Sequence, residues 1–135
     1  MVEMELNKIR IDENRGEQVI VLKEKQGKRL LPIIIGMQEA TAIKMEISHF
    51  APPRPLTHDL MNNLINNLGA KLEKVIIEKL EQNIFYAKLI ITINQAKEIQ
   101  VDARPSDSIA LALRAKAAIY ASEEVLNQVS LPGEQ

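Results

Sequence analysis

The sequence predicts an α+β domain in which helices pack against a largely antiparallel mixed sheet. Short segments with strand-like apolar alternation are joined by short turns, which is typical of antiparallel strands. Strand-like and helix-like segments also follow one another in blocks rather than in strict alternation. The chain has 135 residues, of which 46% are hydrophobic and 26% charged, as expected for one globular domain.

Seven strands are expected, the last of them short. They span residues 2–11, 18–25, 29–35, 72–80, 85–93, 97–101 and 119–120. The apolar phase changes near Asn7 and Lys8, which predicts a β-bulge, and a turn is expected over 12–16. Residues 33–35 are apolar on both faces, which indicates a central strand. Pro32 has no amide hydrogen and favours the start of this strand or a free edge.

Three main helices and a short C-terminal helix are expected. They span residues 37 to about 49, 57–68 and 105 to about 118, with the short one opening at 122–124. Thr57 is a candidate N-cap of the second helix. The predicted buried face of that helix consists of Leu60, Met61, Leu64, Ile65 and Leu68. The third helix is apolar nearly all round, which places it in the core or at a subunit contact.

Composition excludes several classes of function. The absence of cysteine excludes disulfides, thiolate metal sites and a cysteine nucleophile. A net charge of −1 and 3% aromatic residues do not predict strong, nonspecific binding of nucleic acid. No apolar run is long enough to span a membrane, and Glu3 and Glu5 interrupt any export signal. We therefore expect a cytoplasmic protein without membrane contact.

Two polar segments lie where the chain enters a helix, at residues 54–59 and 102–108. Helix N-termini expose backbone N–H groups and favour anions, so Arg54 and Arg104 are candidate contacts for a phosphate of the substrate. Glu39 adds a carboxylate at the start of the first predicted helix.

These segments contain the elements of a metal-assisted hydrolase. If Glu39, Asp59, Asp102 and Asp107 meet in space, their oxygens are suited to Mg²⁺ or Mn²⁺. Such an ion polarises a phosphodiester and activates water, with His58 as a proton carrier. The predicted catalytic residues are His58 and Asp59.

Structural roles explain the same residues. Carboxylates in the first turn of a helix are common capping groups, and Arg54 and Arg104 can pair with Asp59, Asp102 or Asp107 to hold loops in place. The alternative functions are then a non-catalytic binding or regulatory module that oligomerises through the third helix, or a phosphate-ligand sensor.

Three strings resemble the bifunctional nuclease domain family. They are LPIIIG at 31–36 followed by Glu39 and Ala40, RPLTHDL at 54–60, and DARPSDSIALA at 102–112. The resemblance runs in order from about residue 2 to residue 126. It implies a single α+β domain, which we place at 1–128, and the remaining residues 129–135 are expected to be a frayed C-terminal tail. It also implies a homo-oligomer, expected to be a dimer, and nuclease activity on DNA and RNA.

Overall fold

The computed structural model describes residues 1–12, 14 and 16–133. Residues 13 and 15 of the predicted turn, and the last two residues of the predicted tail, lie outside this part of the chain. The strands are β1 (Val2–Ile11), β2 (Gln18–Glu24), β3 (Leu30–Ile35), β4 (Ala70–Glu81), β5 (Ile84–Ile93), β6 (Lys97–Ala103) and β7 (Ala118–Ala121). The helices are α1 (Met37–Ile47), α2 (Thr57–Asn67), α3 (Pro105–Ala115) and α4 (Glu123–Val129).

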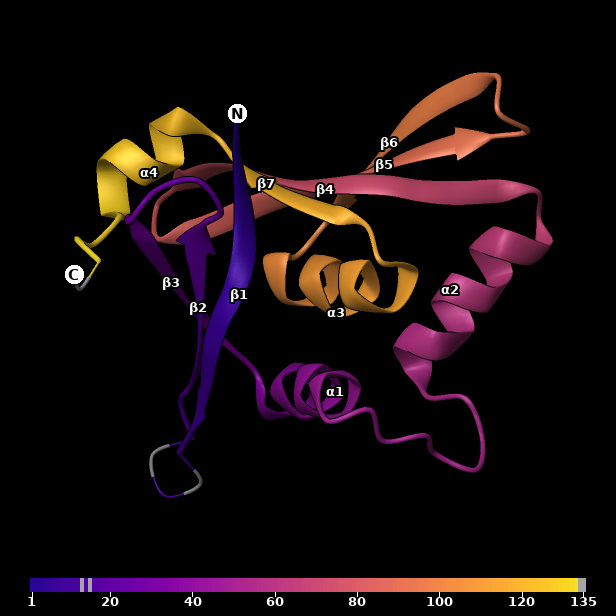
Figure 1. Cartoon of the computed structure of the whole chain (residues 1–135), viewed down its shortest axis with the longest axis horizontal. Helices are drawn as coiled ribbons and strands as arrows, with labels where there is room; N and C mark the ends of the chain where they lie inside the picture. The colour runs from indigo at the N-terminus through magenta and orange to yellow at the C-terminus, as the bar shows by residue number, and fades with distance from the viewer. Residues whose placement is uncertain (13, 15, 134–135) are drawn as a thin grey trace.

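All seven strands form one sheet in the order β3-β2-β1-β7-β4-β5-β6. The β4–β7 pair is parallel and every other pair is antiparallel, so the predicted mixed, largely antiparallel sheet is confirmed. The sheet curls, and α1 and α3 lie on its concave side while α2 closes the open end (Figure 1).

β1 contains the expected bulge, whereas β3 lies at an edge of the sheet instead of its centre. The register of β1 against β2 shifts between Leu6 and Lys8, which is the expected bulge. Among the strands of the described residues, β3 pairs only with β2 and forms an edge of the sheet, so the prediction of a central strand was wrong. Pro32 fits this edge position because it needs no partner for an amide hydrogen. The apolar run reaches the outer face at Ile34, which is 67% exposed.

α3 is the central helix of the core. It contacts α1, α2, β4 and β5, and its residues Ile109, Ala110, Leu111 and Ala112 are buried. Of the two placements expected for the third helix, the core is confirmed.

α2 buries a different face from the one predicted. Met61 and Ile65 pack against the core, but Leu60, Leu64 and Leu68 are 52%, 52% and 75% exposed. Apolar spacing identified the helix, but its apolar residues cover two sides, and the spacing does not tell which side meets the core.

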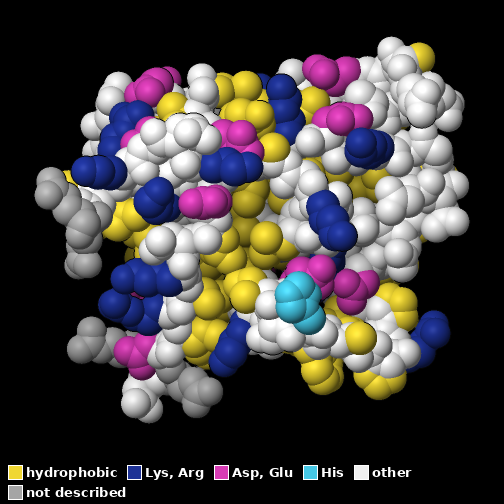
Figure 2. Space-filling model, in the orientation of Figure 1, with side chains coloured by type: hydrophobic (Ala, Val, Ile, Leu, Met, Phe, Trp, Pro, Cys, Tyr) yellow, Lys and Arg dark blue, Asp and Glu magenta, His cyan; other side chains and the backbone are white. Residues whose placement is uncertain are grey.

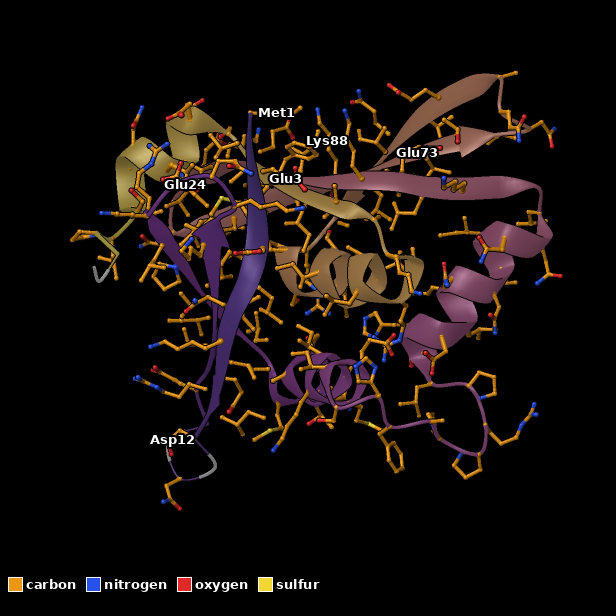
Figure 3. All side chains as sticks on the ribbon, viewed as in Figure 1. Met1, Glu3, Asp12, Glu24, Glu73 and Lys88 are labelled. Carbon is orange, nitrogen blue, oxygen red and sulfur yellow. The ribbon has the colours of Figure 1, made fainter. Side chains whose placement is uncertain are left out.

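The convex face of the sheet carries polar side chains along β4 and β5. Lys88 and Glu73 project from β5 and β4 on the side away from α1 and α3 (Figure 3). Lys88 Nζ lies 2.8 Å from Glu78 Oε1, and Thr92 Oγ1 donates to Glu73. One wet face is typical of an antiparallel sheet.

The C-terminal segment is attached to β4 inside the sheet and to the edge strand β3. Ser122 Oγ accepts from Val125 N at the start of α4 and donates to the Glu78 carbonyl of β4. Within the predicted tail, Leu131 exchanges two backbone hydrogen bonds with Leu30 of β3. None of the helices in the described ranges is both long and apolar enough to cross a membrane.

Candidate functional site

Three carboxylates occupy the same position in three different helices. Glu39, Asp59 and Asp107 are each the third residue of their helix, in α1, α2 and α3. The N-cap of α2 is Leu56 rather than the predicted Thr57, which is the first helical residue. A carboxylate here is favoured by the helix dipole and can accept from the N-cap amide.

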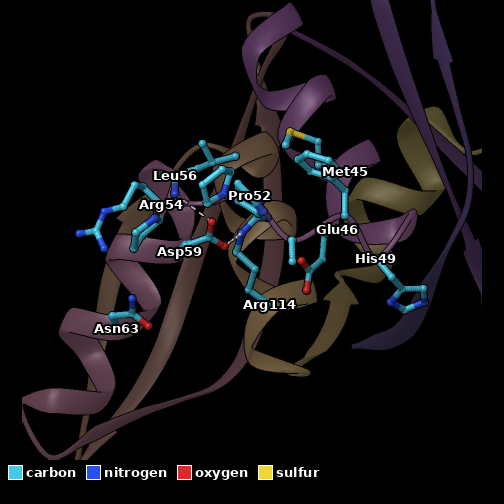
Figure 4. Close-up of a pocket in the computed structure, with 13 residues that line it drawn as sticks. Met45, Glu46, His49, Pro52, Arg54, Leu56, Asp59, Asn63 and Arg114 are labelled. Atoms are coloured by element: carbon cyan, nitrogen blue, oxygen red, sulfur yellow. Dashed lines mark hydrogen bonds and ion pairs between the residues drawn. The ribbon is translucent and has the colours of Figure 1, made fainter.

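Asp59 has this structural role. Its Oδ2 accepts from Leu56 N at 2.9 Å, and Arg114 Nε donates to its Oδ1 at 2.6 Å (Figure 4). Partial burial alone would raise the pKa of Asp59, but these two donors outweigh it and lower the pKa below its ordinary value. Asp59 is thus a charged anchor for the start of α2, which fits a capping role better than that of a metal ligand.

Asp107 behaves differently, because it faces other side chains. In the described part of the chain it makes no bond to its own N-cap amide. His58 Nε2 lies 2.9 Å from Asp107 Oδ1, and Arg104 Nε donates to Asp107 Oδ2, also at 2.9 Å. Burial would raise the pKa of Asp107, but the hydrogen bonds from His58 and Arg104 lower it on balance. Asp107 is therefore held as a carboxylate between two donors.

Arg104 joins a second carboxylate to the first. Its Nη2 lies 2.7 Å from Asp107 Oδ2 and 3.1 Å from Glu39 Oε1, while its side chain remains 67% exposed. The two carboxylates raise the pKa of Arg104, chiefly through the hydrogen bond to Asp107, so the guanidinium stays charged. Glu39 is buried under this guanidinium at the start of α1.

His58, Arg104, Asp107 and Glu39 line one pocket of about 410 Å³. Its other walls come from α1 and from the start of α2, and include Met45, Leu56 and Met61. Three helix N-termini thus contribute polar side chains to one cavity. The guanidinium of Arg104 favours an anion in this pocket, whereas the carboxylates of Glu39 and Asp107 oppose one.

One ring nitrogen of the buried His58 is bonded to Asp107, and the other, Nδ1, is free to contact a ligand or water. A carboxylate only accepts, so Nε2 is the donor to Asp107. Nδ1 has no hydrogen-bond partner among the described residues. The one fully buried side-chain atom without a partner there is Asn62 Oδ1, so Nδ1 is in contact with solvent. With the Nε2 hydrogen directed at Asp107, Nδ1 is the ring nitrogen that can accept a hydrogen bond from a ligand or a water molecule.

Two predicted residues lie away from this pocket. Arg54 is exposed and points away from Asp59 and Arg114 (Figure 4). With Asp59 it lines a neighbouring pocket of about 470 Å³, which shares Met45 and Leu56 with the first. Asp102 is exposed on β6, where it is paired in register with Lys88. Of the residues predicted from the sequence, four lie together at the first pocket, namely Glu39, His58, Arg104 and Asp107. Arg54, Asp59 and Asp102 lie outside it.

Sequence reasoning missed Arg114, which joins three helices. Its side chain is 5% exposed and extends from α3 to Asp59 of α2. It also donates to the carbonyls of Ala110 in α3 and Ala42 in α1. In the sequence it appears only as an interruption of an apolar helix, and its ionic partner is 55 residues away. A charge inside an otherwise apolar helix is the signal that could have revealed it.

A metal ion fits only part of the predicted ligand set. In the described residues no three His, Asp or Glu side chains are grouped closely enough to hold one. Glu39 and Asp107 share the same Arg104 nitrogen and so lie close together. Mg²⁺ is often held by one or two carboxylates, with water and substrate phosphate completing its coordination. Glu39 and Asp107 are the pair that fits this pattern.

Comparison with known proteins gives the family. A family model described as the bifunctional nuclease domain matches residues 20–134. An uncharacterized protein of Mycobacterium tuberculosis is 47% identical over 131 residues, covering 97% of this chain and 77% of that protein.

Plant proteins with an assigned name are more distant. Bifunctional nuclease 2 of Oryza sativa subsp. japonica is 30% identical over 112 residues, which is 81% of this chain and 34% of that protein. Bifunctional nuclease 1 of Oryza sativa subsp. indica is 25% identical over 120 residues, which is 87% of this chain and 36% of that protein. The chain thus spans about a third of each of these plant proteins. From the family model and the matched lengths, the chain belongs to the bifunctional nuclease domain family.

Proposed function

We propose that this protein hydrolyses phosphodiester bonds of DNA and RNA in the pocket lined by Glu39, His58, Arg104 and Asp107. The observation that carries the proposal is the 2.9 Å contact between His58 and Asp107 in a pocket that also presents an exposed guanidinium. A histidine oriented by a carboxylate is a common proton carrier in hydrolysis. The names of the plant relatives support the same class of reaction.

His58 and Asp107 supply the proton transfer. Asp107 accepts a hydrogen bond from the Nε2–H group and so fixes the tautomer, which leaves the Nδ1 lone pair available to a water molecule. As water attacks phosphorus, Nδ1 takes its proton and the bond to the leaving oxygen breaks. The leaving oxygen then receives a proton from the imidazolium or from solvent. The positive charge on the ring during this step is stabilised by Asp107.

Arg104 and the carboxylates supply the electrostatics. The exposed guanidinium of Arg104 is placed to contact non-bridging phosphate oxygens, on which charge develops in the transition state. Two carboxylates in the pocket would otherwise repel a phosphate. For this reason we include Mg²⁺ or Mn²⁺ in the proposal, held by Glu39 and Asp107. When bound, the ion would offset this charge and polarise the phosphodiester. Asp59 and Arg114 position His58 by fixing the start of α2.

The test is cleavage of single- and double-stranded DNA and RNA by pure protein, with Mg²⁺ or Mn²⁺ and with a chelator. Loss of the proton carrier in His58→Asn should lower the cleavage rate by about 10²–10⁴-fold. The matched control is His49→Asn, because His49 is exposed and its φ of 56° suits asparagine. Full activity of His58→Asn would contradict the proposal, as would equal loss in both variants.

A second candidate function is a non-catalytic phosphate-ligand sensor. It is favoured by the ion pairs, because Arg104 and Asp107 already satisfy each other. A sensor would bind inorganic phosphate or a nucleotide, measured by calorimetry, and would lose that binding in Arg104→Met. It would show no cleavage under any metal condition. Cleavage that depends on His58 would exclude this function.

A further inference from the structure

The loop that joins α1 to α2 presents an exposed aromatic ring. Phe50 follows the last turn of α1 and is 54% exposed. The other three aromatic residues of the chain, Phe85, Tyr86 and Tyr120, lie on strands and are half-buried. Figure 2 shows apolar side chains gathered at the corner of the molecule where this loop lies in Figure 1. Phe50 is therefore the aromatic ring that the chain offers most openly to a ligand.

The backbone around Phe50 is held in place. Its amide donates to the Met45 carbonyl at 3.0 Å, just beyond the end of α1. The residue before it, His49, has a φ of 56°, in the left-handed region that few residues other than glycine adopt. Three prolines between residues 52 and 55 restrict the loop that follows. A ring on a restricted backbone loses less entropy when it packs on a ligand.

Phe50 lines the pocket of about 470 Å³ that adjoins the pocket at His58 and Arg104. The two pockets share walls formed by Met45 and Leu56. The volume of the pocket at Phe50 is within the range of sites that bind small ligands. Because the pockets share two walls, consecutive units of one chain-like ligand can occupy both.

The interior of the pocket at Phe50 favours an uncharged group. Asp59 is paired with Arg114, so these two charges offset each other. Glu46, which is half-buried, adds a carboxylate that opposes a phosphate inside the pocket. Asn63 contributes an amide, which can both donate to and accept from a neutral polar ligand. A nucleobase is a flat ring with hydrogen-bonding edges, and it suits the combination of Phe50 and Asn63.

The rim of this pocket carries a cation. Arg54 is exposed, and its guanidinium points away from Asp59 and Arg114 (Figure 4). Within the described residues its side chain has no ion-pair partner. A base inside the pocket with its phosphate at the rim matches this distribution of charge. An apolar peptide side chain would fill the pocket but would leave Arg54 without a partner.

We propose that this pocket binds one unpaired base of a single-stranded nucleic acid, stacked on Phe50, while an adjacent phosphate lies at the pocket of His58 and Arg104. The inference rests on the proposed hydrolysis of phosphodiester bonds and names its preferred substrate. A base in a duplex is paired and stacked, so it must first be unpaired before it can enter. Single strands of DNA or RNA are therefore preferred to duplexes, with little dependence on base sequence, because every base has an aromatic face.

Binding is measured in a His58→Asn background, in which the substrate is not consumed. Fluorescence anisotropy gives the Kd of a short labelled single strand and of a hairpin duplex of the same composition. Adding Phe50→Leu should raise the Kd of the single strand by about tenfold, because stacking on the ring is lost, and should leave the Kd of the duplex unchanged. The matched control is Tyr86→Leu, which removes a ring that lines neither pocket and should change neither Kd.

A second variant reports the contact directly. The chain contains no tryptophan, so Phe50→Trp places a single indole at the position of the ring. This variant should bind the single strand at least as tightly as its parent, and the single strand, but not the duplex, should quench its emission. The emission of Tyr86→Trp should respond to neither. Thermal melts verify that both variants at Phe50 are folded.

Cleavage separates a failure of this inference from a failure of the proposed function. In the chain that retains His58, Phe50→Leu should lower kcat/KM for single strands by about tenfold and for duplexes only slightly. Equal losses on both substrates, or no loss on single strands, would overturn the inference even where cleavage depends on His58. A chain that cleaves nothing would refute the proposed function. In that case the base pocket would still be supported by quenching in Phe50→Trp, and an unchanged Kd in Phe50→Leu would overturn it.

Discussion

Asp107 connects the two donors of the site, because one carboxylate accepts from both His58 and Arg104. The next residue, Ser108, donates a hydrogen bond from its hydroxyl group to the Arg104 carbonyl, and this bond helps to fix the start of α3. The position of the carboxylate is thereby set by the backbone as well as by its partners. A change at this residue should affect both stability and its dependence on pH.

The expected result for Asp107→Asn is a loss of roughly 1–2 kcal/mol in the free energy of unfolding at neutral pH, because hydrogen bonds to a charged acceptor are lost. The pKa of Asp107 is lower in the folded protein than in the unfolded chain, so the folded state binds fewer protons. Its contribution is therefore complete above the unfolded pKa of about 3.9 and disappears as the pH falls through the lowered folded pKa.

Urea denaturation of both proteins over this pH range measures the effect. The difference in unfolding free energy between wild type and Asp107→Asn should shrink toward acid pH. Exposed Asp102 provides the control, since Asp102→Asn should change stability by less than about 0.5 kcal/mol. A difference for Asp107→Asn that is constant with pH would contradict this role.

At the scale of elements, α1, α2 and α3 meet at one buried arginine. Arg114 donates to groups in all three helices, and it therefore sets the positions from which Glu39, His58 and Asp107 reach the pocket. The distances in the site depend on this junction, although Arg114 is not a wall of the first pocket.

Replacing Arg114 with methionine should destabilise the protein by about 3 kcal/mol, because Asp59 loses its ionic partner in a largely buried place. Arg54→Met is the matched control and should change stability by less than about 0.5 kcal/mol, since Arg54 is exposed. Thermal and urea unfolding measure both. Similar losses in the two variants would refute the role of Arg114 as the junction.

The elements also show what local sequence patterns can predict. The three helix N-termini were found because proline, acidic residues and the change of apolar spacing are local signals. The pairing of Arg114 with Asp59 was missed because it depends on packing between helices far apart in sequence. The face of α2 was misassigned for the same reason, since Leu64 and Ile65 are equally apolar and only the core decides between them.

At the scale of the whole molecule, charge is nearly balanced, with 17 basic and 18 acidic residues. The proposed binding of nucleic acid would then depend on a few local contacts rather than on a basic surface. Arg104 is the cation that the site offers.

Binding of single-stranded oligonucleotides should therefore depend weakly on salt. With one to three phosphate contacts, a plot of log K against log salt concentration should have a slope between about −1 and −2. Fluorescence anisotropy at several salt concentrations measures it, and Arg104→Met should make the slope shallower. A slope steeper than about −5 would reveal an extended basic surface and contradict this expectation.

The fold class was predictable at this scale, but the order of the strands was not. Alternation and short turns give the hairpins β1–β2 and β4–β5 directly. The position of β7 between β1 and β4 cannot be read from a four-residue segment, because its partners are distant in sequence. Likewise, β3 was expected inside the sheet because its apolar run resembles that of a central strand.

That placement of β7 has a consequence for synthesis on the ribosome. The hairpins built from β1–β3 and from β4–β6 can each pair as soon as they emerge, but the strand that joins them is made last. The three-stranded units β1–β3 and β4–β6 therefore cannot join into one sheet until residue 121 has left the exit tunnel. In a chain truncated before that point, β1 and β4 lack the partner that β7 provides, and unpaired strand edges are surfaces that promote aggregation.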